Sequence, residues 1–227
     1  RSQPGSTVGE TVRHLGGSSG ADIKKWVDLM DNNFVFPHIK VLFPTAPLQP
    51  YSLVNGEMSN IWFDRAGISP AVPEKIDSLS KIEVEVKKLI KSENDLGIPT
   101  DRIIVGGFSM GGSLSFHIGF RWEKKVAGTF VISSFLNNKS MVYQELKNNL
   151  GKNKSELYFS PPLLQLHGDS DELVPANWGE DTYQELKKLG VQGEFHRLPK
   201  LGHSINRTGI LIVKEWIEKH LPNVYNK

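Results

Sequence analysis

The chain contains no cysteine among its 227 residues. Disulfide bonds, thiolate metal ligands and S-acylation of the protein itself are therefore excluded. No apolar run approaches the roughly 18 residues that a membrane-spanning helix needs, and the first residues lack the apolar stretch of a signal peptide. These absences predict a cytoplasmic protein with no stable membrane insertion.

A strong charge of either sign is missing as well. The sequence has 27 Lys and Arg residues against 25 Asp and Glu residues, which gives a formal net charge of +2. A balance this even creates no field that would attract nucleic acid or an anionic membrane. No pair of histidines has the spacing of metal ligands, and no glycine-rich stretch ends in the Gly-Lys-Ser/Thr of a phosphate-binding loop. We therefore expect neither a nucleic-acid partner nor a bound metal.

Strands and helices are predicted to alternate along the chain, within a single domain over residues 1–227. Apolar residues at helical spacing predict helices at 21–33 and from 76 to about 97, with a strand at 38–43 and a long irregular segment at 45–73 between them. Further strands are expected at 102–107, 126–135, 161–168 and 192–199, and further helices at 111–120, 141–150, 178–189 and 209–221. This alternation indicates βαβ units and a mostly parallel sheet flanked by helices.

The stretch RIIVGGFSMGGS carries the strongest chemical signal. Gly107-Phe108-Ser109-Met110-Gly111 fits the pattern G-x-S-x-G between a predicted strand and a predicted helix. In that context a sharp turn forces the serine into a strained backbone conformation and projects its hydroxyl above the sheet. The backbone N–H of Met110 then points from a helix N-terminus towards a developing oxyanion. The alternative is a tight glycine turn with an inert serine.

A nucleophilic serine needs a base and a carboxylate that orients the base. Two later loops, HGDSDELVP and LGHSINRTG, each follow a predicted strand, so they meet at the C-terminal edge of the sheet. His203 in the second loop is the better base, against the alternative that it packs the loop or caps a helix. Asp169 and Asp171 in the first loop are both candidates for the acid, one orienting His203 while the other caps the loop. His167 is expected to brace this loop.

With these residues in place, the sequence resembles the acyl-protein thioesterase and lysophospholipase family of α/β-hydrolases. The stretches FPTAP, NIWFDR, DRIIVGGFSMGG, SSFLN, HGDSDELVP and GH carry the resemblance and extend over most of the chain. The resemblance implies an α/β-hydrolase fold with Ser109 as nucleophile, His203 as base and Asp171 as acid, because the family acid precedes the LVP element. Met110 differs from the glutamine that the thioesterases of this family have after the nucleophile.

The resemblance also implies acyl transfer through an acyl-enzyme on Ser109, with no cofactor. The expected substrate is a small-molecule ester or thioester, or an acylated protein. The resemblance is compatible with a shallow site that prefers short acyl chains and with the apolar channel that the long-chain thioesterases of the family use. No oligomeric state is predicted. Trp62 and Phe63 are expected either to shape the entrance of the acyl pocket or simply to pack under the long irregular segment.

The stretch TVRHLGGSSG is where the sequence departs from the family. Its composition alone is typical of a flexible linker. The first loop of the family reads His-Gly-x-Gly-Asp-x-Gly, and the same register here starts at His14, with Leu15 in place of a glycine and Ser18 in place of the aspartate. Gly16 is then the residue whose N–H completes the oxyanion hole.

The residues before this loop, VGETVRH, place Glu10 and Arg13 where a buried apolar strand is expected. Either residues 1–10 are disordered or are not the family's own strand, or the N-terminal strand is truncated or irregular and holds the oxyanion loop poorly. Losing one oxyanion donor costs about 10²–10³ in rate. We therefore predict a serine esterase or thioesterase, with a catalytically weakened, hydrolase-fold binding protein as the alternative.

Overall fold

The computed structural model describes residues 19–31, 34–150 and 160–223. Its centre is a four-stranded parallel sheet in the order β3-β4-β5-β6. The strands are β3 (Ile104–Phe108), β4 (Gly128–Ile132), β5 (Leu163–Gly168) and β6 (Gly193–Leu198). A helix follows each strand in turn: α4 (Met110–His117), α5 (Met141–Leu150), α6 (Ala176–Lys188) and α7 (Arg207–His220). The predicted α/β architecture is confirmed, and the carboxyl ends of all four strands lie at one edge of the sheet.

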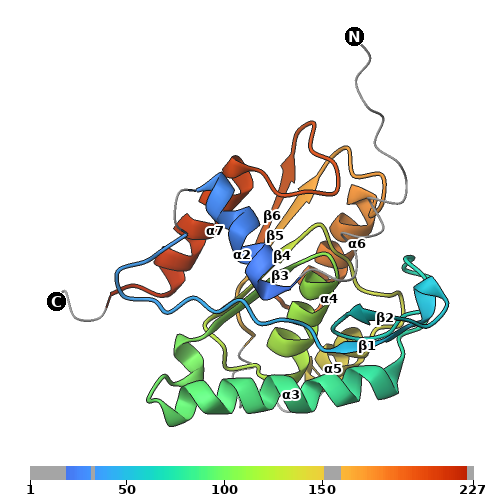
Figure 1. Cartoon of the computed structure of the whole chain (residues 1–227), viewed down its shortest axis with the longest axis horizontal. Helices are drawn as coiled ribbons and strands as arrows, with labels where there is room; N and C mark the ends of the chain where they lie inside the picture. Colours follow the sequence, from blue (N-terminus) through green and yellow to red (C-terminus); the bar gives the residue numbers. More distant parts are fainter. Residues whose placement is uncertain (1–18, 32–33, 151–159, 224–227) are drawn as a thin grey trace.

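Helices cover both faces of the sheet (Figure 1). On one face, α2 (Gly20–Met30) and α7 pack against β4, β5 and β6 through one apolar cluster that includes Val27, Leu164 and Trp216. On the other face, α4, α5 and α6 form a second cluster that includes Phe116, Leu146 and Leu186. Because helices cover both faces, all six residues of β5 are buried, including the polar side chains of Gln165 and His167.

A third cluster extends the core away from the sheet. The long helix α3 (Ile76–Asp95) presents Leu79, Ile82, Val86 and Ile90 to α4, at the helical spacing that predicted it. The side chain of Met110 at the start of α4 is part of this cluster. The packing of α3 therefore supports the turn at which α4 begins.

Two predictions for the segment between α2 and α3 are wrong. Residues 38–43 form no strand, because the described residues offer them only the isolated bridge between Phe36 and Ile39. Within the segment predicted as irregular, β1 (Leu48–Tyr51) and β2 (Glu57–Asn60) pair as an antiparallel hairpin. The turn passes through Asn55 and Gly56, with φ of 56° and 84°. Asn-Gly is a common hairpin signal because both residues tolerate positive φ.

In the part of the chain that the structure describes, no helix is long and apolar enough to cross a membrane. The same residues include no group of three or more histidines and carboxylates that could hold a metal ion.

Candidate active site

Ser109 occupies a strained turn between β3 and α4. Its φ of 53° and ψ of −117° lie in a region of backbone conformation that residues other than glycine rarely adopt. The backbone is held there because the Ser109 N–H donates to the carbonyl of Ile132, at 2.9 Å, and the Ser113 N–H donates to the carbonyl of Ser109, at 3.1 Å. Such over-determined strain is typical of a nucleophile elbow, in which the hydroxyl projects above the sheet.

Two glycines make this turn sterically possible. A Cβ on Gly107 would lie 2.3 Å from the carbonyl carbon of Gly111. A Cβ on Gly112 would lie 2.7 Å from the Cβ of Ser134 and 2.9 Å from a methyl group of Val131. The second glycine of the G-x-S-x-G pattern, Gly111, is less restricted, because a Cβ there would meet only the indole Nε1 of Trp62, at 3.6 Å. The close contacts between the strands and α4 therefore depend on Gly107 and on Gly112, the glycine after the motif, rather than on Gly111.

Gly112→Ala is expected to lower the free energy of unfolding by about 1–3 kcal/mol, because its methyl group must displace the side chains of Ser134 and Val131 in a packed core. Gly111→Ala is the matched control and is expected to change stability by less than about 1 kcal/mol. Urea unfolding of both variants checks the difference. Equal destabilisation would contradict the close approach of α4 and β4 at Gly112.

His203 links the serine to a carboxylate. Its Nε2 lies 3.0 Å from the Ser109 hydroxyl oxygen, and its Nδ1 lies 2.8 Å from Oδ2 of Asp171. The imidazole is nearly buried, with 9% of the side chain exposed, and the Asp171 side chain is fully buried. Ser109 follows β3, Asp171 follows β5 and His203 follows β6, so three strand ends bring these side chains together, as the sequence predicts for a parallel sheet.

The carboxylate of Asp171 is held in its ionised form. Burial raises the pKa of Asp171, but hydrogen bonds from His167, His203 and the Val174 N–H outweigh burial and hold that pKa well below its ordinary value. Oδ1 accepts from the N–H groups of Leu173 and Val174, whereas Oδ2 faces Nδ1 of His203 at 2.8 Å and Nε2 of His167 at 3.5 Å. Asp171 therefore presents a fixed negative charge to the imidazole.

The second carboxylate of this loop has a different position. Oδ1 of Asp169 accepts from the Lys200 N–H at 2.7 Å and from the Ser170 hydroxyl at 2.8 Å. It thus ties the loop after β5 to the segment after β6. The geometry separates the two candidate acids, since the carboxylate that accepts the hydrogen bond from His203 is that of Asp171.

Two further side chains position these groups. Nε2 of His167 lies 2.8 Å from the carbonyl of Val174, in agreement with its expected place beside the loop. The ring of Phe108 lies 4.7 Å from that of His203, centre to centre, and packs edge-on against Trp26 of α2 at 5.4 Å. Phe108 was not predicted to contact the base, although it is the residue directly before the serine in the G-x-S-x-G pattern.

The remaining candidate residues have the following places. Met110 is the first residue of α4, where backbone N–H groups have no partner within the helix. Gly16 lies outside the described residues. The indole of Trp62 lies beside Gly111, whereas Phe63 is buried in the third cluster and also lines a small cavity next to Ser113. A role for Trp62 and Phe63 in the acyl pocket stays a prediction.

Comparison with known proteins identifies the family. Residues 14–221 match the family described as Phospholipase/Carboxylesterase. Lysophospholipase-like protein 1 of Mus musculus is 41% identical over 210 residues, which cover 92% of this chain and 85% of the relative. Acyl-protein thioesterase 1 homolog 1 of Dictyostelium discoideum is 32% identical over 213 residues, covering 91% of this chain and 87% of that relative.

Solved structures agree with the fold. The crystal structure of Arabidopsis thaliana SOBER1 aligns with a TM-score of 0.76 at 25% identity, covering 91% of this chain and 95% of that one. The crystal structure of Zea mays acyl-protein thioesterase 2 aligns with a TM-score of 0.69 at 23% identity, covering 91% of this chain and 90% of that one. The family match spans nearly the whole chain, and the chain therefore belongs to the phospholipase/carboxylesterase family of α/β-hydrolases.

Proposed function

We propose that this chain is a serine hydrolase that cleaves carboxylic esters or thioesters through an acyl-enzyme on Ser109. The observation that carries the proposal is the unbroken series of hydrogen-bond contacts from Ser109 through His203 to Asp171, on a strained turn between a strand and a helix. Membership of the family supports hydrolysis in general. The names of two relatives, a lysophospholipase-like protein and an acyl-protein thioesterase, are consistent with ester and thioester bonds.

The first half of the reaction forms the acyl-enzyme. Nδ1–H of His203 donates to Asp171, so Nε2 carries the free electron pair and accepts the hydroxyl proton of Ser109. The serine oxygen attacks the carbonyl carbon and forms a tetrahedral intermediate. Its oxyanion is stabilised by the N–H of Met110 and by that of Gly16. His203 then returns the proton to the leaving alcohol or thiol as the C–O or C–S bond breaks.

The second half releases the acid. His203 accepts a proton from a water molecule, whose oxygen attacks the acyl carbon. The tetrahedral intermediate collapses as the bond to Ser109 breaks, and His203 gives the proton to the serine oxygen. The products are a carboxylic acid and the free enzyme. All proton transfers use His203, so the mechanism needs no cofactor.

The substrate in this proposal is a small-molecule ester or the acyl group of an acylated protein, in the cytoplasm. In this proposal Trp62 and Phe63 contact the acyl group. The position of Trp62 beside Gly111 and that of Phe63 at the cavity next to Ser113 are consistent with such contacts. The alternative, a binding protein of the same fold, rests on the sequence of the oxyanion loop, with Leu15 and Ser18 in place of the family residues.

A fluorophosphonate probe tests the proposal, because it phosphonylates a serine only where a base activates it. We expect stoichiometric labelling of the wild type, no labelling of Ser109→Ala, and normal labelling of the control Ser204→Ala, which changes a serine beside His203. The wild type and Ser204→Ala should also hydrolyse p-nitrophenyl acetate, whereas Ser109→Ala should not. A folded wild type that is neither labelled nor active would favour the binding-protein alternative.

A further inference from the structure

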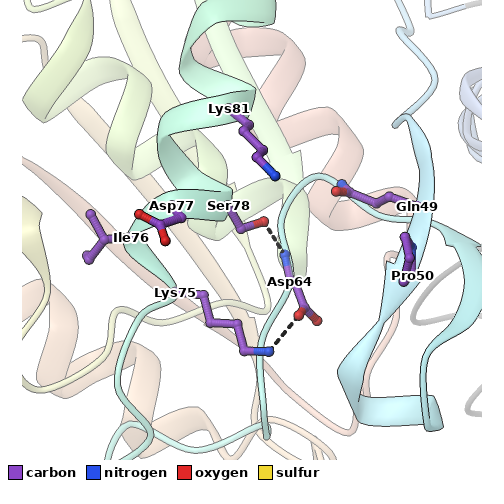
Figure 2. Close-up of a pocket in the computed structure, with 8 residues that line it drawn as sticks. All are labelled: Gln49, Pro50, Asp64, Lys75, Ile76, Asp77, Ser78 and Lys81. Atoms are coloured by element: carbon purple, nitrogen blue, oxygen red, sulfur yellow. Dashed lines mark hydrogen bonds and ion pairs between the residues drawn. The ribbon is translucent and has the colours of Figure 1, made fainter.

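Two cavities lie near the loop 64–75, and they differ in their relation to Ser109. The larger, of about 470 Å³, lies at the start of α3 and is lined by residues such as Gln49 and Lys81 (Figure 2). The smaller, of about 20 Å³, is lined on one side by the loop 64–75 and on the other by Ser113 and Phe135. Ser113 lies one helical turn beyond Ser109 on α4, and its N–H donates to the Ser109 carbonyl. Of the two, the small cavity is therefore the one that reaches α4, one helical turn beyond Ser109.

The loop 64–75 forms the outer wall of this small cavity through Val72 and Pro73. Its two ends are fastened together, since Lys75 Nζ lies 2.6 Å from Oδ2 of Asp64 (Figure 2). The Asp64 N–H also donates to the Ser78 hydroxyl of α3, at 2.8 Å. A loop with joined ends moves as a unit, and its position depends on what holds its outer part.

Asn137 holds that outer part. Its side-chain Nδ2 donates to the carbonyl of Ser69 at 3.0 Å and to the carbonyl of Val72 at 2.6 Å, and the residue itself lines the cavity. The neighbouring Asn138 contributes only its backbone N–H, which donates to the carbonyl of Pro70. The side-chain NH₂ group of Asn137 thus donates both of its hydrogen bonds to the loop 64–75.

A buried contact between a carboxylate and an imidazole fixes the inner end of the wall. Oε1 of Glu74 lies 3.2 Å from Nε2 of His117 on α4, with 5% and 2% of these side chains exposed. Oε2 of Glu74 accepts from the Met141 N–H at the start of α5. Burial raises the pKa of Glu74, but the hydrogen bonds from His117, Ser140 and Met141 outweigh it and keep that pKa below its ordinary value. The inner end is thus attached to the core, so the outer hydrogen bonds decide how far the wall can open.

We propose that Asn137 is a specificity-determining residue that holds the loop 64–75 closed and so limits the length of the acyl chain that Ser109 can accept. The inference rests on the proposed function. A cavity of about 20 Å³ has room for roughly one water molecule or methyl group, so an acyl chain longer than a few carbons needs the wall to move. Without the two donors of Asn137, the outer part of the loop keeps the hydrogen bond from the Asn138 N–H to Pro70 but loses those at Ser69 and Val72, so the wall beside the cavity is held less firmly while both ends stay anchored.

Asn137→Ala tests this, with Asn138→Ala as the matched control. The control changes the same residue type in the same loop, at an exposed position whose backbone N–H is retained. For p-nitrophenyl esters from acetate to decanoate, we expect the ratio of kcat/KM for decanoate to that for acetate to rise about tenfold in Asn137→Ala and to stay within about twofold in Asn138→Ala. If the alanine variant folds poorly, Asn137→Asp takes its place in the experiment. It keeps the shape of the side chain and removes both donors, so it should show the same rise in the ratio.

Binding of sodium decanoate gives a readout that does not need turnover. In a Ser109→Ala background, calorimetry should show tighter binding after Asn137→Ala and no change after Asn138→Ala. Turnover with an unchanged chain-length ratio in both Asn137 variants would overturn this inference and leave the proposed function standing. Absence of Ser109-dependent turnover together with increased decanoate affinity would overturn the proposed function and leave the role of Asn137 standing.

Discussion

Replacing Ser109 by glycine is expected to remove nearly all catalysis and to leave a protein that is more stable than Ser109→Ala. Loss of the nucleophile in a serine hydrolase lowers kcat by about 10⁶-fold, and both Ser109→Gly and Ser109→Ala should show this loss. Only glycine, however, adopts the observed φ of 53° and ψ of −117° without steric strain. The two variants therefore separate the chemical role of the side chain from its conformational cost.

Strain at a non-glycine residue of this kind costs about 1–3 kcal/mol, which is partly offset by the greater chain entropy that glycine loses on folding. We expect Ser109→Gly to exceed Ser109→Ala by about 1 kcal/mol in free energy of unfolding, measured by urea denaturation. Equal stability of the two variants would mean that the strain is no larger than the entropy cost of glycine, which is about 0.5–1 kcal/mol. Turnover of p-nitrophenyl acetate within about tenfold of the wild-type rate in either variant would exclude Ser109 as the nucleophile.

The position of the serine could be predicted because several independent signals agree there. A buried strand, a G-x-S-x-G pattern and a helix follow one another within about fifteen residues, and parallel strands gather their ends at one edge. The same reasoning predicted that His203 would meet Ser109. It could not choose between Asp169 and Asp171 from spacing, because the choice depends on which carboxylate the loop turns towards the imidazole.

The segment between α2 and α3 was harder for physical reasons. Residues 38–43 have the composition of a strand, yet strand formation depends on a neighbouring ladder, and the described residues provide none. The hairpin of β1 and β2 carried a readable signal at Asn55-Gly56, but the prolines and polar residues around it obscured the short strands. Similarly, the role of Asn137 depends on contacts between residues far apart in sequence, which no local pattern reveals.

Asp171→Asn is expected to lower kcat about 10⁴-fold, whereas Asp169→Asn should leave it within about threefold of the wild type. An asparagine at 171 can still accept the N–H groups of Leu173 and Val174 through its carbonyl oxygen, so its NH₂ group then faces Nδ1 of His203. That arrangement moves the imidazole proton to Nε2, which can no longer accept the proton of Ser109. Asparagine at 169 keeps the oxygen that accepts from Lys200, and the loop keeps its shape.

Asp171→Asn is also expected to change how the free energy of unfolding depends on pH. The pKa of Asp171 in the folded protein lies below its unfolded value of 3.8, so the carboxylate stabilises the fold above that pH. This contribution is lost as the pH falls from about 4 towards the folded pKa. The difference in free energy of unfolding between wild type and Asp171→Asn should therefore be largest near neutral pH and shrink in acid. A difference that stays constant down to pH of about 2 would mean that the paired carboxylate contributes no charge-dependent stability.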